Sequence, residues 1–156
     1  MTDPVRRRDE VGTAEDRGWQ EFRATCLRLS AQQMLQPGYY PEGWSAKDLV
    51  NHLGTWMAEA TQVLEQLTND TYRKRDLDVD AMNARFLEAT RPLDLESSWA
   101  QLFAARTMML TVFGRLPEAS LSDVAFGWFE ESGPRHYEEH LPRLQAWVDE
   151  LTGAAA

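Results

Sequence analysis

Apolar residues recur along the chain at intervals of three and four positions, a spacing that places them on one face of an α-helix. The longest run follows Ser45 and Asp48, which have the form of a helix-capping box with a shorter acid at its third position. It ends near Asn69-Asp70, and its apolar positions are Leu49, Leu53, Trp56, Ala60, Val63 and Leu67. The pattern predicts a helix of about six turns with one buried stripe.

Three similar stripes predict three more long helices. The first ends near Pro37, the second ends before Pro117, and the third begins at Pro134, because proline is well tolerated at the first helical position. Their inward positions are, in chain order, Trp19, Phe22, Cys26 and Leu29; then Leu95, Trp99, Leu102, Arg106, Met109, Phe113 and Leu116; then Tyr137, Leu141, Leu144, Val148 and Leu151. A shorter helix is expected from Val79 to Ala89, ended by Arg91-Pro92.

These elements predict an all-α fold. The segment 124–129 is compatible with a strand or a short helix, and no pair of strands stands out elsewhere. The economical architecture is an antiparallel four-helix bundle with a short extra helix in the crossover. Residues 13–152 would form this single domain, with a flexible N-terminus over 1–12 and a frayed C-terminus over 153–156.

Charge and composition narrow the classes of function. The 156 residues carry 16 Lys+Arg against 25 Asp+Glu, a net charge of −9, so we expect no nucleic-acid partner. No apolar run approaches the roughly 20 residues that cross a bilayer, and no secretory signal follows the N-terminal arginines. The single cysteine, Cys26, excludes an internal disulfide, and its place on a stripe indicates core packing. We expect a cytoplasmic protein with no membrane partner.

The chain contains three histidines, His52, His136 and His140. A spacing of four on a helix puts the last two on one face, with Cβ atoms about 5–6 Å apart, so both rings can reach one divalent ion. That pair is equally compatible with two partly exposed helix residues. His52 lies at the edge of the buried stripe of its helix, where a lone histidine is more often simply packed. Together the three predict one metal site with an open fourth position, the catalytic arrangement.

Two features of the last helix bear on this site. His136 and His140 also fit the inverted zinc-peptidase pattern with Glu139 as base, but only 16 residues follow His140, too few for the further acidic ligand that such enzymes need. Pro142 removes the backbone hydrogen bond to the Glu138 carbonyl. If the helix ended before Pro142, the argument that the pair shares a face would weaken.

Two motifs carry a resemblance to a known family. Residues 43–56 (GWSAKDLVNHLGTW) and 136–144 (HYEEHLPRL) resemble the second-helix and last-helix motifs of the DinB-like superfamily. These damage-inducible four-helix-bundle proteins are related to mycothiol-dependent maleylpyruvate isomerases and bacillithiol transferases. The resemblance implies a divalent-metal site with His52, His136 and His140 as ligands. Maleylpyruvate isomerases usually carry glutamate at the position of His136. We also expect no added C-terminal domain, so the likeness favours the thiol-transferase group.

The resemblance implies a metal-dependent, stress-related enzyme that transfers a low-molecular-weight thiol to an electrophilic small molecule. Zinc or nickel are the ions expected, although imidazole also suits copper and iron. The alternative is a binding or sequestering protein that holds metal without turnover. Homodimers are common in the resembling family, so a homodimer is a further possibility here.

Two other residues are candidates for binding a cosubstrate. Arg106 interrupts an apolar stripe, and the paired N–H groups of its guanidinium could bind the carboxylate of a cosubstrate. The alternative is that Arg106 forms an ion pair between helices or extends its guanidinium to the edge of the bundle. Trp56 lies one turn after His52 and either borders the pocket or is plain core. Weaker candidates near the same pocket are Trp128, Phe129, Asn83 and, for orienting His52, Asp48.

Overall fold

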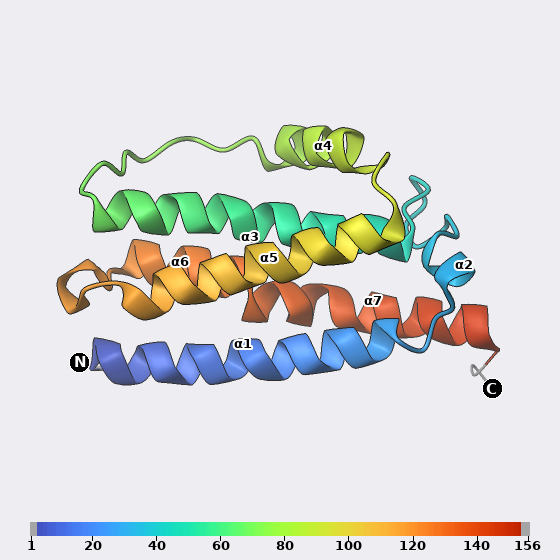
Figure 1. Ribbon diagram of the computed structural model, residues 1–156, viewed down its shortest axis with the longest axis horizontal. Helices are drawn as coiled ribbons and strands as arrows, with labels where there is room; N and C mark the ends of the chain where they lie inside the picture. Colours follow the sequence, from blue (N-terminus) through green and yellow to red (C-terminus); the bar gives the residue numbers. More distant parts are fainter. Residues whose placement is uncertain (1–2, 154–156) are drawn as a thin grey trace.

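A computed structural model describes residues 3–153, and its regular structure is helical throughout, with no strand in that range (Figure 1). The fold class is therefore all-α, as the apolar periodicity predicts. The helices are α1 (Pro4–Cys26), α2 (Ala31–Met34), α3 (Ala46–Thr68), α4 (Val79–Thr90), α5 (Leu95–Arg115), a 3₁₀ turn (Glu118–Ser120), α6 (Asp123–Ser132) and α7 (Pro134–Thr152). None of the helices described here combines the length and apolar character needed to span a membrane.

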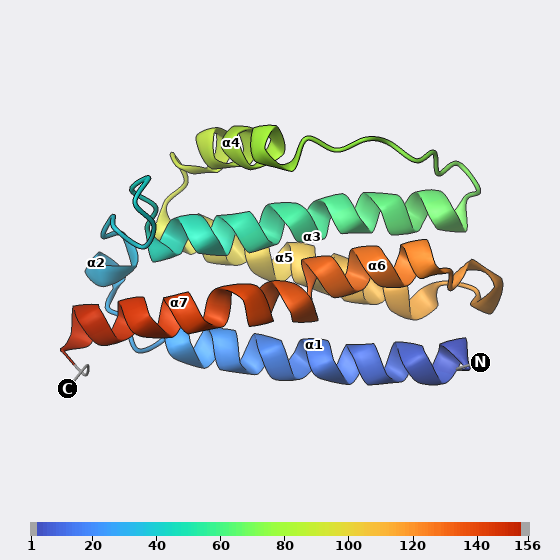
Figure 2. The same ribbon diagram turned by 180° about the vertical axis from the view of Figure 1, so that it is seen from behind.

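The long helices lie side by side along one axis (Figures 1 and 2). α3 packs against α5, α1 packs against α7, and α6 lies against α3 and continues into α7. α1 and the α6–α7 pair run in one direction, whereas α3 and α5 run in the other. α5 is parallel to α3 because the crossover through α4 returns the chain to the end at which α3 began. The α4 helix lies on the outer side of α3.

The predicted helix starts are present as side-chain caps. Ser45 and Asp48 form the capping box of α3: the Asp48 carboxylate accepts from the Ser45 amide at 2.9 Å, and the Asp48 amide donates to Ser45 Oγ at 3.2 Å. Asp94 caps α5 by accepting from the Ser97 amide at 2.7 Å. Each cap satisfies backbone N–H groups that a helix leaves free, which fixes where the helix begins.

The N-terminal boundary of the domain differs from the predicted one. α1 begins at Pro4 rather than after residue 12, and Asp3 accepts from the Val5 amide at 2.9 Å. The first turns are held by their arginines: the Arg7 guanidinium lies 4.0 Å from the centre of the Phe126 ring, and Arg8 donates to the Leu116 carbonyl at 2.9 Å. A run of charges that reads as solvated is therefore packed. At the other end Gly153 caps α7 with φ +69°, and residues 154–156 lie outside the described range.

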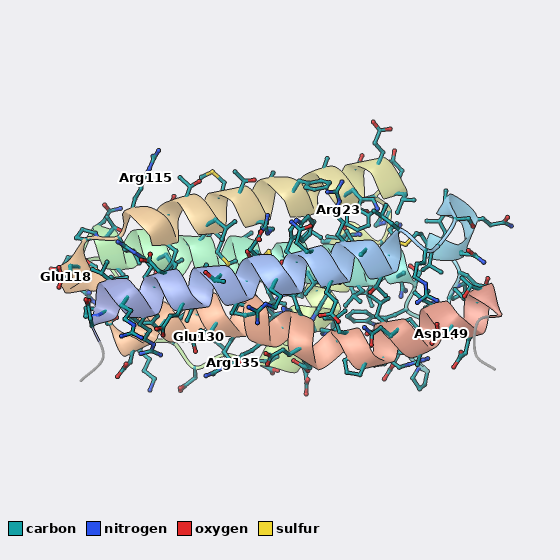
Figure 3. The ribbon with its side chains drawn as sticks, turned by 90° about the horizontal axis from the view of Figure 1, so that it is seen from below. Arg23, Arg115, Glu118, Glu130, Arg135 and Asp149 are labelled. Atoms are coloured by element: carbon teal, nitrogen blue, oxygen red, sulfur yellow. The ribbon has the colours of Figure 1, made fainter. Side chains whose placement is uncertain are left out.

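The segment 124–129 is helical and belongs to α6, which is separated from α7 by Gly133 alone. A side chain at Gly133 would bring its Cβ to 3.0 Å from the Phe129 carbonyl oxygen, so the tight junction needs glycine. Glu130 and Arg135 flank the junction in Figure 3, and their side chains form an ion pair at 3.0 Å. α7 then continues through Pro142 to Thr152 without ending. The two histidines of α7 therefore do share a face.

Candidate metal centre

The three histidines converge between α3 and α7. His52 lies in the second turn of α3, and His136 and His140 lie in the first two turns of α7. Their ring centres are 4.8 Å apart for His52–His136, 5.2 Å for His52–His140 and 5.0 Å for His136–His140. One nitrogen of each ring lies within 4.8 Å of the other two. The three side chains are close enough to hold one metal ion, as the sequence predicts.

The nitrogens face one another at a spacing near that of a metal site. His52 Nε2 lies 2.9 Å from His136 Nε2. Nitrogen ligands at 2.0–2.1 Å around a tetrahedral ion are separated by about 3.3 Å, so small ring rotations would suffice. All three rings are buried, His52 being 9 %, His136 7 % and His140 5 % exposed. A buried imidazole needs a partner for its polar atoms, and a shared cation would provide one to all three.

The rings are held in the neutral form that binds metals. Burial lowers the pKa of His52 to about 3, and the neighbouring His140 lowers it further. Burial also sets the pKa of His136 well below its usual value, with His52 and His140 adding to the effect and a backbone group of Ser132 opposing it. Burial lowers the pKa of His140, and Glu139 opposes that shift. Each neutral imidazole keeps one N–H and presents a lone pair on its other nitrogen, which is the state that coordinates a divalent ion.

Two tyrosines orient His140 from the loop before α3. Tyr39 Oη lies 3.2 Å and Tyr40 Oη 3.3 Å from His140 Nδ1, and Tyr39 also donates to the His140 carbonyl at 3.5 Å. Since Nδ1 faces these hydroxyls, Nε2 is the nitrogen left for a metal. Metal-bound histidines are commonly oriented in this way through their second nitrogen. No pattern in the sequence indicated a role for these two tyrosines.

The surroundings of His52 and His136 are less polar. The Trp44 ring stands edge-on to His52, with ring centres 5.2 Å apart. Nδ1 of His136 is buried and makes no hydrogen bond with the residues described. The Asp48 carboxylate bonds to Ser45 and makes no hydrogen bond with His52, so capping is the role that the structure gives it. His140 is therefore the ring with the most firmly set orientation.

A cavity of about 630 Å³ opens beside the histidines. His52 and His136 border it, whereas His140 lies behind them. Trp56 lines the cavity, as one of its two sequence interpretations proposed, and its Nε1 donates to Asn83 Oδ1 at 2.8 Å. Trp128 and Asn83, both candidates from the sequence, also line it. A metal held by the three rings would therefore lie beside a cavity that two of those rings border.

Several cavity residues carry no signal in the sequence. Tyr72, Lys74 and Leu77 belong to the extended segment between α3 and α4, which crosses over the cavity, and Glu131 and Glu139 project from α6 and α7. An extended segment has no helical periodicity from which its inward residues can be read. Glu139 could have been found from its position one turn after His136.

Arg106 lies elsewhere. Its guanidinium forms a two-pronged ion pair with Glu15, with both N···O distances 2.7 Å, and Tyr137 Oη donates to the same carboxylate at 3.0 Å. Glu15 is fully buried, so it needs this cation. Arg106 does not border the cavity beside the histidines. The structure thus gives it the ion pair between helices rather than a position to bind a cosubstrate.

The donor set fits a divalent metal. Three neutral nitrogen ligands from two rigid helices, with a cavity on one side, match the three-ligand arrangement of catalytic metal sites.

Compared with protein-family models, curated proteins and solved structures, the chain matches none of them.

Proposed function

We propose that this protein is a divalent-metal-dependent enzyme that transfers a low-molecular-weight thiol to an electrophilic small molecule. The observation that carries the proposal is the convergence of His52, His136 and His140 beside a cavity that reaches two of the three rings. We propose zinc or nickel as the ion, and a DinB-like four-helix bundle as the family fold; the bundle is not simply antiparallel, because the packed pairs α3–α5 and α1–α7 each run in the same direction. The placement of α4 in a crossover and of the three histidines on α3 and α7 supports the family assignment.

The chain supplies three buried rings on two helices and a mainly apolar cavity beside them. A divalent ion in such a site lowers the pKa of a bound thiol, so that a thiolate is present at neutral pH. His52 and His136 border the cavity and turn their Nε2 atoms toward each other, and the Tyr39 and Tyr40 hydroxyls hold the ring of His140. Trp56 is fixed by its bond to Asn83 and excludes water from one side of the cavity. An electrophile in the cavity would then lie beside the open face of the site.

The test begins with the purified protein and its bound metal. Metal content is measured first, and thiol consumption is then followed with model electrophiles in the presence of common bacterial thiols. The proposal predicts thiol consumption that stops when a chelator removes the metal and returns when metal is restored. The His52→Ala variant is expected to show neither metal binding nor thiol consumption. Metal bound without any thiol chemistry would contradict the transferase proposal.

That last outcome defines the second candidate, a protein that binds or sequesters metal without turnover. Glu139 borders the cavity but lies outside the cluster of three histidines, so a fourth ligand from this residue would require its exposed side chain to turn toward the rings. Spectra of a cobalt-substituted protein would separate the two functions. Three nitrogens and an exchangeable water support the enzyme, whereas a fourth ligand from the protein, lost in Glu139→Gln, supports the binding role.

A further inference from the structure

The cavity beside the histidines is elongated. Its wall on one side is a single face of α6 and α7, formed in order by Val124, Gly127, Trp128, Ser132 and His136. At 1.5 Å per helical residue, Val124 and Ser132 are roughly 12 Å apart along α6, and His136 lies beyond Gly133 in the first turn of α7. His52 and His136 therefore lie toward one end of a groove whose lining also includes Tyr72, Lys74 and Leu77 of the extended segment between α3 and α4.

The groove is apolar inside and charged at its rim. Trp56, Trp128, Leu77, Val79 and Val124 line it, and the two tryptophan rings lie 6.5 Å apart between centres. Val79 is 49 % and Val124 38 % exposed, which places both among the large hydrophobic residues that the described fold leaves open to solvent. The charged lining residues, Lys74, Glu131 and Glu139, are all exposed. Among the described residues, none inside the groove carries a charge that could pair with a charged group on a ligand.

We propose that this groove holds an elongated, apolar small molecule, chain-like in form, whose reactive end lies against His52 and His136. Removing apolar surface from water on both the groove and the ligand supplies the binding free energy. The volume of about 630 Å³ is in the range of sites for small molecules. A compact polar ligand would leave the tryptophan walls uncovered. The identity of the reactive end rests on the proposed function, but the fit of the apolar body does not.

Gly127 offers a way to block the groove without disturbing the fold. It lies in α6 and lines the groove, and an added Cβ would meet no heavy atom within 4 Å. Leucine at this position would point into free space and also favours a helix more than glycine does. Gly114 in α5 is a matched control, because a Cβ there meets nothing within 4 Å either and the residue does not line the groove. Both variants are expected to fold and to bind metal as the wild type does.

The experiment measures binding of straight-chain 1-alkanols of increasing length by calorimetry and by tryptophan fluorescence, with and without zinc. We expect the Kd to fall about fourfold for each added methylene until the chain fills the groove. Gly127→Leu should abolish this dependence for the longer alcohols, while Gly114→Leu retains it. Cyclic alcohols of equal carbon number should bind more weakly than the straight chains.

Three outcomes would overturn the proposal: a Kd that does not change with chain length, equal binding by Gly127→Leu and Gly114→Leu, or tighter binding of the cyclic alcohols. Zinc binding is measured on the same samples. If the alcohols bind as expected and zinc does not bind, the groove inference stands and the proposed metal-dependent function fails. If zinc binds and the alcohol series shows no length dependence, only the groove inference fails.

Discussion

Nε2 of His52 and Nε2 of His136 lie 2.9 Å apart, although the two residues are separated by 84 positions in the chain. Neutral imidazoles at this distance can share one proton, or both can direct lone pairs at a cation. The third ring, His140, lies with its centre within 5.2 Å of both and is turned by two tyrosine hydroxyls. A common cation is the partner that accounts for all three rings at once.

The first prediction concerns acid stability of the metal-free protein. Because burial lowers the histidine pKa values in the folded state, the unfolded chain binds more protons as pH falls below 6.5. Stability from these groups is present above that pH and is lost as pH falls toward the folded value, which for His52 is about 3. Each ring that stays neutral should lower the free energy of unfolding by up to about 1.4 kcal/mol per pH unit.

Urea denaturation in EDTA between pH 7.5 and 5.5 measures this slope. His52→Phe keeps an aromatic ring in place but removes one titrating group. The number of protons taken up on unfolding, which sets the slope of stability against pH, should therefore be smaller by about one. A wild-type stability that stays flat over this range would show that the rings are already protonated or not buried.

The second prediction assigns the orientation of His140 to Tyr39 and Tyr40. Replacing both with phenylalanine keeps the rings and removes the hydroxyls that face His140 Nδ1. Zinc affinity should fall about 10- to 100-fold, the usual effect of losing such a partner. Tyr72→Phe is the matched control, since Tyr72 lines the cavity without contacting His140 Nδ1. Equal zinc affinity in the double variant and the control would contradict the assignment.

The third prediction concerns Arg106. Arg106→Met leaves the buried Glu15 carboxylate without its cation, so the free energy of unfolding should fall by about 3–5 kcal/mol. Adding Glu15→Leu should restore most of that loss, because no charge is then left buried. The KM for the thiol should not change in the double variant. A raised KM with unchanged stability would instead show that Arg106 binds the cosubstrate.

The fourth prediction excludes Cys26 as the reacting thiol. The residue is 2 % exposed, and burial raises its pKa to about 12, so almost no thiolate forms near neutral pH. Iodoacetamide at pH 8 should alkylate Cys26 only after the protein is denatured. Thiol transfer by Cys26→Ala should proceed at the wild-type rate. Loss of transfer in a folded, metal-loaded Cys26→Ala would contradict this view.

Patterns within a few residues of the sequence were enough to predict helices, their caps and side chains that share one helical turn. The spacing of His136 and His140 and the Ser45–Asp48 cap involve residues within one helical turn, and the structure confirms both. The place of His52 beside a buried stripe is by itself more typical of a packed histidine, and only together with the pair on α7 did it predict the convergence of the three rings. Pro142, which could have ended the last helix, does not, because α7 is already packed against α1 on both sides of it.

The partners of polar side chains could not be predicted, because they come from segments far apart in the sequence and no local pattern records such contacts. Arg106 was recognised as an unusual stripe residue, but its partner Glu15 lies 91 positions away. The two tyrosines reach His140 from a loop about 100 positions earlier in the chain. The packing of α1 from Pro4 depends on Arg7 meeting Phe126 of α6. In each case a polar side chain has several plausible partners, and only the fold selects one.

The most direct test of the account is a zinc titration of the metal-free protein against a chromophoric chelator. We predict one zinc ion per chain for the wild type, and loss of that binding in each of His52→Ala, His136→Ala and His140→Ala. Thermal melting of the same samples should show stabilisation by zinc for the wild type alone. Zinc binding that is absent in the wild type, or that survives all three substitutions, would contradict the claim that these rings form one metal centre.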